Sequence, residues 1–350
     1  MSITNYKCIG CSAPIAFNPN IGSFKCEYCG KQSTEEELKE FAEKTEEKWA
    51  EKHAHEKHDD GSEVRQYNCP NCGAEVVCGD TTTASFCYYC HSPVIIESRL
   101  QGDFRPNKIV PFKIDKKTAI QKFSEWISGK KFLPRDFTVD IQQKNIIGMY
   151  LPYWDVDVDG DIDYHAVGIT ENSRIMGDQE EITTHRYQID RNGTMHFPAI
   201  RSLSFEKINQ NLINAINPFN AADEKEFNTG YLSGFQSERH TYSRENAEKS
   251  ALQQAIQYAR IQLHASTECD RIVEERDNSK YKIANTTYTL LPVYILNYPY
   301  KGKNYQFAVN GQTGVANGDL PTDTTQVALF SILIGVIVLI LALLGGIFLW

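Results

Sequence analysis

The chain has 350 residues, of which 41% are hydrophobic and 23% are charged, and its net charge is −9 at pH 7. This length gives room for two or three domains, and the composition excludes a largely disordered chain. The negative net charge argues against a protein whose main function is to bind a nucleic-acid backbone. The negative mean hydropathy excludes a polytopic membrane protein.

Eight of the ten cysteines form two groups of four with the same internal spacing. In each group a Cys-x2-Cys pair is followed after fourteen residues by a second such pair, and the second group repeats the first 61 residues later. Two such pairs place four thiolates in a tetrahedron around Zn²⁺, and a site closed by four sulfurs is structural because it has no room for a catalytic water. The sequence therefore predicts two structural zinc ions. The predicted ligands are Cys8, Cys11, Cys26 and Cys29 at the first site and Cys69, Cys72, Cys87 and Cys90 at the second.

These tetrads define two small β zinc ribbons, at residues 1–32 and 62–99. Each ribbon is too short to bury a core of its own, so metal binding is expected to supply its folding energy. A disulfide framework is the alternative, but the N-terminal segment has neither the basic nor the apolar region of a signal peptide. Thiolates that bind zinc predict a reducing compartment. Cys78 and Cys269 are predicted to be buried or free thiols, and His91 is surplus to a complete tetrad.

Residues 33–61 are predicted to form a charged helical linker between the ribbons. Ser33 or Thr34 can cap its first turn, and five lysines oppose eleven acidic residues, a net charge of −6. The favoured interpretation is a solvated spacer helix. The histidines at positions 53, 55 and 58 could bind a metal opportunistically, but their spacing is not that of the zinc-protease HExxH motif.

The body, residues 100–325, is predicted to be α+β. Helices are expected at residues 117–128 and 243–265, and an apolar stripe on the second indicates the side that faces the core. The stripe consists of Leu252, Ile256, Ala259 and Leu263. Strands are expected at residues 150–169, 181–189, 194–198 and 281–315, the last with turns at Lys301-Gly302 and Asn310-Gly311.

A weaker internal repeat lies within the body. Leu-Pro-Tyr-Trp at residues 151–154 resembles Leu-Pro-Val-Tyr at residues 291–294, and each motif leads into a strand, a glycine turn and a returning aromatic strand. The body is therefore predicted to contain two related β units flanked by helices.

Five aspartates alternate with other residues along the first long strand, from Asp155 to Asp163. This pattern resembles the opening of an EF-hand calcium loop with Gly160 at position six, but position twelve is Ala166 where that loop has a bidentate glutamate. The favoured interpretation is a strand with one apolar face and one solvated acidic face. A Ca²⁺ or Mg²⁺ site is the alternative.

Residues 327–350 contain no charged side chain and a single hydroxyl, that of Ser331. As a helix this segment is about 36 Å long, enough to cross a hydrocarbon core of about 30 Å. We predict a single transmembrane helix that acts as a tail anchor in the cell membrane, with the soluble part in the cytosol. A buried core helix is the alternative. The flank at residues 317–326 has two aspartates and no lysine or arginine, so it does not indicate orientation.

Several common catalytic motifs are missing from the sequence. It has no P-loop, no dinucleotide fingerprint and no nucleophile elbow. We therefore predict that the protein is not an enzyme and has no ATPase or helicase activity.

Taken together, these features resemble one family, the bacterial membrane proteins with a transcription-factor-IIB-type zinc ribbon. The resemblance rests on the paired ribbons, the charged linker, Ile-Val-Pro-Phe at residues 109–112, the motif at residues 151–154 and Val-Asn-Gly-Gln-Thr-Gly at residues 309–314. Some members are labelled primosomal helicases, but this sequence lacks the P-loop lysine that would hold ATP. The resemblance implies no reaction.

Three functions are consistent with these patterns. The leading hypothesis is a membrane-tethered, non-enzymatic interaction module that binds a protein partner at the cytosolic membrane surface. The second is a nucleic-acid-binding module of replication or transcription, for which Lys7, Lys25 and Lys31 form only a thin basic set. The third is a divalent-cation-dependent enzyme that uses the aspartates at residues 155–163.

Overall fold

The computed structural model describes residues 3–4, 6–38, 40–41, 64–69, 71–87, 90–134, 137, 146–176 and 179–348. Of the predicted helical linker at residues 33–61, residues 35–38 and 40–41 are helical. The rest of it from residue 42, with the three histidines, lies outside the described residues.

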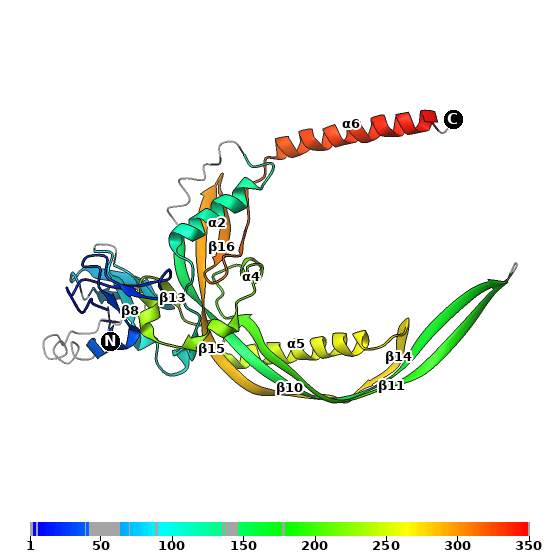
Figure 1. The fold of residues 1–350 in the computed structure, drawn as a ribbon, viewed down its shortest axis with the longest axis horizontal. Helices are drawn as coiled ribbons and strands as arrows, with labels where there is room; N and C mark the ends of the chain where they lie inside the picture. The colour runs from blue at the N-terminus through cyan, green and yellow to red at the C-terminus, as the bar shows by residue number, and fades with distance from the viewer. Residues whose placement is uncertain are drawn as a thin grey trace.

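The fold is mixed α+β, as predicted, with two small N-terminal four-cysteine β units, a large mixed sheet and a long apolar C-terminal helix (Figure 1). The first unit contains β1 (Ile3–Thr4), β2 (Ala16–Asn18), β3 (Ser23–Lys25) and β4 (Gln32–Ser33). The second contains β5 (Val64–Asn68), β6 (Glu75–Gly79), β7 (Thr82–Phe86) and β8 (Pro93–Ile96).

The body follows with alternating short and long elements. Its strands are β9 (Lys108–Ile109), β10 (Ile147–Met176), β11 (Gln179–Leu203), β12 (Lys225–Glu226), β13 (Gln236–Glu238), β14 (Arg271–Asp277), β15 (Lys280–Tyr300), β16 (Lys303–Asn310) and β17 (Ala316–Gly318). Its helices are η1 (Glu97–Arg99), η2 (Gly102–Phe104), α2 (Lys116–Ser128), α4 (Gln210–Asn214), η3 (Ala221–Asp223), η4 (Thr229–Leu232) and α5 (Arg244–Ala265).

Strand β10 is the centre of the large sheet. It pairs antiparallel with β15 on one side, and the register places Leu151 opposite Leu291. The two similar motifs of the sequence are therefore direct neighbours, one near the start of β10 and the other within β15. Along its other edge β10 pairs antiparallel with β11 and, near its start, in parallel with β13.

The motifs at residues 109–112 and 309–314 pack against each other in the core. Phe112 stacks on Phe235 with ring centroids 4.0 Å apart, and the Gly311 carbonyl accepts a hydrogen bond from the Lys113 amide at 2.9 Å. A Cβ atom added to Gly311 would lie 2.5 Å from the Phe112 ring. The glycine is thus required by close packing, and these motifs serve the fold of the body.

Helix α5 lies along the concave side of the curved strands β10, β11 and β15 (Figure 1). Its buried side chains repeat every fourth residue and are mostly small: Ala247, Ala251, Ala255, Ala259 and Leu263. The predicted stripe is therefore partly wrong, because Ile256 is exposed and Leu252 is half-buried. Alanines let the helix backbone approach the curved sheet closely, and this places the larger apolar residues at the flank of the contact.

Beyond α5 the two longest strands continue as an isolated hairpin, which we call the arm: residues 170–176 of β10 and 179–185 of β11. The sequence predicted that the first strand ends at residue 169, where the pairing with β14 also ends. Figure 1 shows the arm extending far from the rest of the sheet.

The C-terminal helix α6 (Thr324–Phe348) includes a stretch at residues 324–341 that is long and apolar enough to cross a membrane and has none of its residues buried. Asp323 caps this helix by accepting hydrogen bonds from the amides of Thr325 and Gln326. The Phe330 ring lies 5.3 Å from the Phe132 ring, a contact between the start of the helix and the body. This exposure does not fit the alternative of a buried core helix.

Candidate metal centres

Each predicted tetrad brings its four sulfurs together. All Sγ atoms of a group lie within 4.8 Å of one another, and the described residues contain two such groups. In the first, Cys8 lies 3.5 Å from Cys29 and Cys11 lies 3.6 Å from Cys26. In the second, both cross-pairs, Cys69 with Cys90 and Cys72 with Cys87, are 3.7 Å apart. A tetrahedron with metal–sulfur bonds near 2.3 Å has edges of about 3.8 Å, so each group fits a tetrahedral ion.

Four turns of one design position these sulfurs. In each, the amide of the first cysteine donates to the carbonyl five residues later, and the amide four residues later donates to the carbonyl of that cysteine. The residue at this fourth position always has a positive φ, which favours glycine. These residues are Ser12, Gly30, Gly73 and His91, with φ of 57°, 74°, 74° and 55°. His91 is therefore the residue with positive φ in the last of these four turns, the turn that begins at Cys87.

One thiol in each group has a lowered pKa. Burial raises the pKa of Cys8, but hydrogen bonds from the Gly10 and Cys11 amides outweigh it and lower the pKa to about 7. At Cys90 burial also raises the pKa, while hydrogen bonds that include the Ser92 hydroxyl lower it to about 6. Each group thus contains one thiol that ionises near neutral pH, the form that binds a metal ion, while the pKa values of Cys11 and Cys69 are raised to about 12.

The first ribbon is attached to the body through an aromatic contact. Phe17 packs edge-on against Tyr231 of η4 with ring centroids 5.1 Å apart. The Phe17 amide donates to the Ser233 carbonyl at 3.0 Å, and the Ser233 hydroxyl donates to the Ile15 carbonyl at 2.7 Å. The residues by which this ribbon docks on the body therefore lie between its two cysteine pairs.

The second ribbon is continuous with the large sheet. Its strands β5 and β6 form a separate pair, whereas β7 and β8 belong to the large sheet. There β7 pairs with β13 of the body, and β8 pairs with β1 of the first ribbon. Cys78, outside the tetrads, is buried beside Cys69 and Val76, and Cys269 is half-buried against Gly168.

The aspartates at residues 155–163 lie on one strand, β10, as the favoured interpretation predicted, but the predicted solvated face is wrong at Asp155, which is buried. Residues 156, 158, 160, 162 and 164 are buried, so the aspartates share the opposite face. Within the described residues, the groups that converge closely enough to hold a metal ion are the two cysteine tetrads, and these aspartates are not among them.

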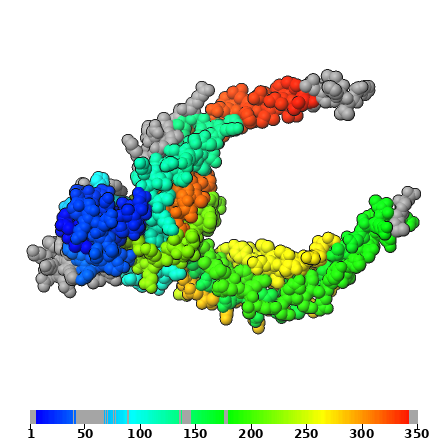
Figure 2. All heavy atoms as spheres, viewed as in Figure 1, coloured from blue at the N-terminus to red at the C-terminus, as the bar shows by residue number. Residues whose placement is uncertain are grey.

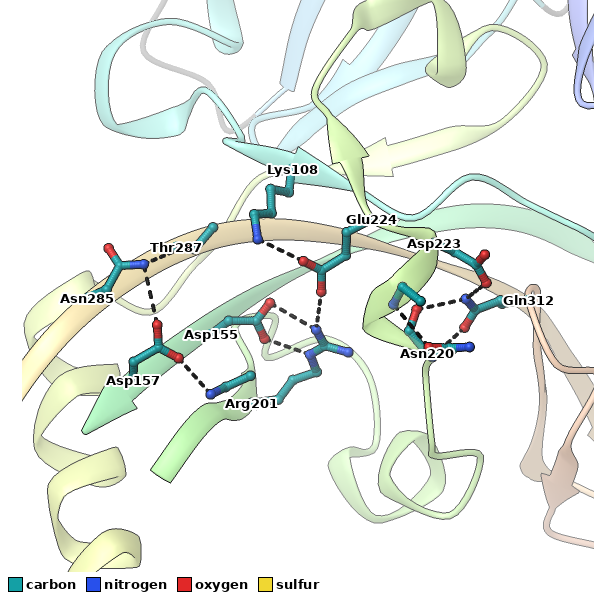
Figure 3. A network of polar contacts seen from close by, with 12 residues as sticks. Lys108, Asp155, Asp157, Arg201, Asn220, Asp223, Glu224, Asn285, Thr287 and Gln312 are labelled. Atoms are coloured by element: carbon teal, nitrogen blue, oxygen red, sulfur yellow. Dashed lines mark hydrogen bonds and ion pairs between the residues drawn. The ribbon is translucent and has the colours of Figure 1, made fainter. Parts of the chain in front are cut away.

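Asp155 is the buried end of an ion-pair network that Arg201 links together (Figure 3). Its two carboxylate oxygens accept from Arg201 Nε at 2.6 Å and Nη2 at 3.0 Å. The same guanidinium donates to Glu224 at 2.8 Å, and Glu224 pairs with Lys108 at 2.9 Å. The network joins β9, β10 and β11 to the segment before β12. Sequence reasoning missed Arg201, Glu224 and Lys108, because cross-strand register brings together residues far apart in the chain.

Three of the other four aspartates of this face also have partners within the chain. Asp157 accepts from the Ala199 amide at 2.7 Å, and Asp159 contacts His196 Nδ1 at 2.8 Å. Asp163 contacts His165 Nε2 at 2.9 Å. These contacts hold the curved strands together and use the carboxylate oxygens that a cation would need.

Replacing Arg201 by methionine should lower the free energy of unfolding by about 3 kcal/mol, because it leaves the buried carboxylate of Asp155 without its ion-pair partner and leaves Glu224 paired with Lys108 alone. The side chains of Arg201 and Asp155 are only 16% and 8% exposed. The matched control is Arg186→Met, whose ion pair with Glu274 is exposed and should contribute less than about 1 kcal/mol. Denaturant unfolding of the detergent-solubilised chain measures both. Equal effects of the two substitutions would contradict the assignment.

His165 at the root of the arm should make this region sensitive to pH. Hydrogen bonds to Asp190 and Asp163 raise its pKa above the usual 6.5. The stabilisation is therefore complete below pH 6.5 and is lost as the pH rises through the raised pKa. After correction for intrinsic rates, amide exchange near His165 should be faster at pH 8 than at pH 6. His165→Gln should abolish the difference and His185→Gln should retain it; a difference that survives in His165→Gln would refute this role.

Comparison with known proteins identifies a relative over nearly the whole chain. The chain is 31% identical over 327 residues to the uncharacterized protein YdjG of Bacillus subtilis (strain 168), and the match covers 93% of this chain and 92% of the other. No protein-family profile matches the chain. No solved structure matches it.

Proposed function

The chain belongs to the family of YdjG, and from this premise we propose that it is a membrane-tethered zinc-ribbon protein that binds a protein partner at the cytosolic membrane surface. It acts without catalysing a reaction. In this proposal each cysteine tetrad holds one structural zinc ion, and α6 crosses the cell membrane once with the remainder of the chain in the cytosol.

The proposal rests mainly on the exposed apolar side chains of the arm. The arm exposes apolar side chains away from the core: Ile175 is 78% exposed, Ile182 60%, and nearby Tyr187 51%. Ile175 and Ile182 lie on the same face, because Ile182 is opposite Ser173 in the register. Large exposed apolar side chains on a projecting hairpin are typical of a protein-binding element.

The edge of β11 supports the same conclusion. Among the described residues β11 pairs only with β10, so its outer edge offers main-chain donors and acceptors along the whole strand. A partner strand can add to such an edge, and the side chains of the arm would then supply specificity.

The connection of the arm to α6 supports a partner at the membrane. The arm and α6 belong to one chain and leave the same body (Figure 2). A partner held by the arm would therefore be tethered to the membrane that α6 enters.

Zinc is the ion that this donor set favours. Four sulfurs at tetrahedral distances suit Zn²⁺, which needs no further ligand in a structural site. Its role here is to fold the cysteine-containing turns and to hold the first ribbon against Tyr231. The ion is therefore structural and catalyses no reaction.

Shortening the arm tests the proposed function. Residues 172–183 are replaced by Asn-Gly, which closes a two-residue turn between Glu171 and Thr184, a pair in the present register. Affinity purification from detergent-solubilised native membranes should recover a protein partner with the full chain and lose it with the shortened chain. Ile182→Ser should weaken recovery, whereas Ile256→Ser, an exposed isoleucine on α5, should not. Unchanged recovery with the shortened arm would refute the proposal.

A further inference from the structure

An open cleft with a volume of about 650 Å³ lies at the base of α6. One wall comes from the end of β15 and the start of β16, with Tyr300, Lys301, Lys303 and Tyr305, and the other comes from residues 321–325 at the start of the helix. The cleft therefore lies at the point where the chain leaves the body and its apolar segment begins.

A second pair of lysines lies beside the same helix start. Lys130 and Lys131 are exposed and directly precede Phe132, whose carbonyl accepts a hydrogen bond from the Asp323 amide at 2.8 Å. The Gln326 side chain donates to the Leu133 carbonyl at 3.4 Å. The segment after α2 is thus fixed against the first turn of α6, and its lysines are held close to the cleft.

Among the described residues the fold gathers more lysines than carboxylates here, whereas the adjacent sequence has no basic residue. The flank at residues 317–326 contains Asp319 and Asp323 and no basic residue. Asp323 caps α6; the hydrogen bonds from Gln326 and Thr325 lower its pKa, and the charge of nearby Lys301 adds to this effect. Against these two carboxylates, the β15–β16 turn and the segment after α2 bring four exposed lysines.

Aromatic rings support this basic surface. Lys130 Nζ lies 4.8 Å from the Trp126 ring centroid, and Lys301 Nζ lies 4.9 Å from that of Tyr300. Tyrosine and tryptophan favour the membrane–water interface, and lysines near an apolar helix reach the headgroup layer.

From this arrangement we propose that the base of α6 binds the headgroups of anionic phospholipids, with Lys301 and Lys303 as the principal contacts and Lys130 and Lys131 beside them. This inference rests on the proposed membrane tether. The hydrocarbon-spanning segment begins after residue 326, so the cleft is level with the phosphates of the leaflet on the side of the body. That leaflet is the cytoplasmic one in the proposed topology, and its anionic lipids complement the lysines.

Binding of lipid to the full-length chain in detergent micelles tests this inference. Native mass spectrometry should show preferential retention of phosphatidylglycerol over phosphatidylcholine. Each lysine near an anionic surface contributes about fivefold, so Lys301→Gln with Lys303→Gln should weaken phosphatidylglycerol binding roughly 25-fold. Replacing the same two lysines by arginine should restore binding. Lys280→Gln with Lys282→Gln removes two exposed charges at the other end of β15 and should leave binding unchanged.

The outcomes separate the headgroup site from the tether. If the chain fractionates with membranes but shows no preference for phosphatidylglycerol, or if the glutamine variant retains it equally, the headgroup site is refuted and the tether stands. If inorganic phosphate displaces the lipid at equal concentration, the cleft is a site for free phosphate and the proposal is wrong. If the unmodified chain fractionates with soluble proteins, both the tether and the headgroup site fail.

Discussion

Cys26→Ser should lower the zinc content of the purified chain from two ions to one. A tetrad with three sulfurs binds zinc far more weakly, and a metal-dependent ribbon loses the free energy that folds it. The knuckle that contains Cys26 depends on its backbone pairing with Lys31 and on the left-handed Gly30, a geometry that the ion holds in place. Elemental analysis measures the stoichiometry.

In Cys26→Ser the loss of structure should include the contact of the first ribbon with the body but should not reach the rest of the body. Phe17 and Phe24 pack against each other at 5.5 Å, and Phe17 contacts Tyr231, so unfolding of the ribbon exposes this aromatic surface. We expect faster amide exchange over residues 6–33 and at η4, with β10 and β15 unchanged. Cys269→Ser, which alters a cysteine outside both tetrads, is the control and should leave two zinc ions. Two ions in Cys26→Ser, or fewer than two in the unmodified chain, would contradict the assignment.

Much of the candidate metal site was predictable because its signal is local. Two residues between cysteines and a repeat of 61 residues identify the groups without any knowledge of the fold, and the structure brings each group together. The long helices and strands were predictable for a similar reason, since their periodicity lies within a single segment. The relation between residues 151–154 and 291–294 was also visible, but their direct pairing was not, because sequence similarity carries no register.

The features that were missed depend on contacts between distant segments. Arg201 pairs with Asp155 across a strand register interrupted by a bulge, and no spacing in the sequence indicates this pair. On α5 the larger residues Leu252 and Ile256 suggested the buried face, whereas close approach to a curved sheet selected alanines. The lysines around the start of α6 come from two other segments of the chain. The acidic flank at residues 317–326 alone therefore did not indicate the positive charge at this place.

Deleting residues 327–350 should release the chain from the membrane fraction and leave both metal sites filled. The described residues 324–341 of α6 contribute nothing to the core, because none of that stretch is buried. The contact of Phe330 with Phe132 is lost with the helix, but the hydrogen bond from the Asp323 amide to the Phe132 carbonyl involves only residues that are retained. We therefore expect a soluble product that retains two zinc ions, measured by fractionation and elemental analysis.

The topology proposed for the full chain is tested by labelling in cells. If the eight tetrad thiols bind zinc they need a reducing compartment, and in the proposed topology the lysines at the base of α6 face the anionic cytoplasmic leaflet. A cysteine introduced at Lys280, an exposed position on β15, in a Cys269→Ser background should react with a membrane-impermeant maleimide only after the cells are permeabilised. The unsubstituted background controls for labelling of the tetrads. Reaction in intact cells would place the body outside, where the tetrads would be prone to oxidation, and the proposed topology would be wrong.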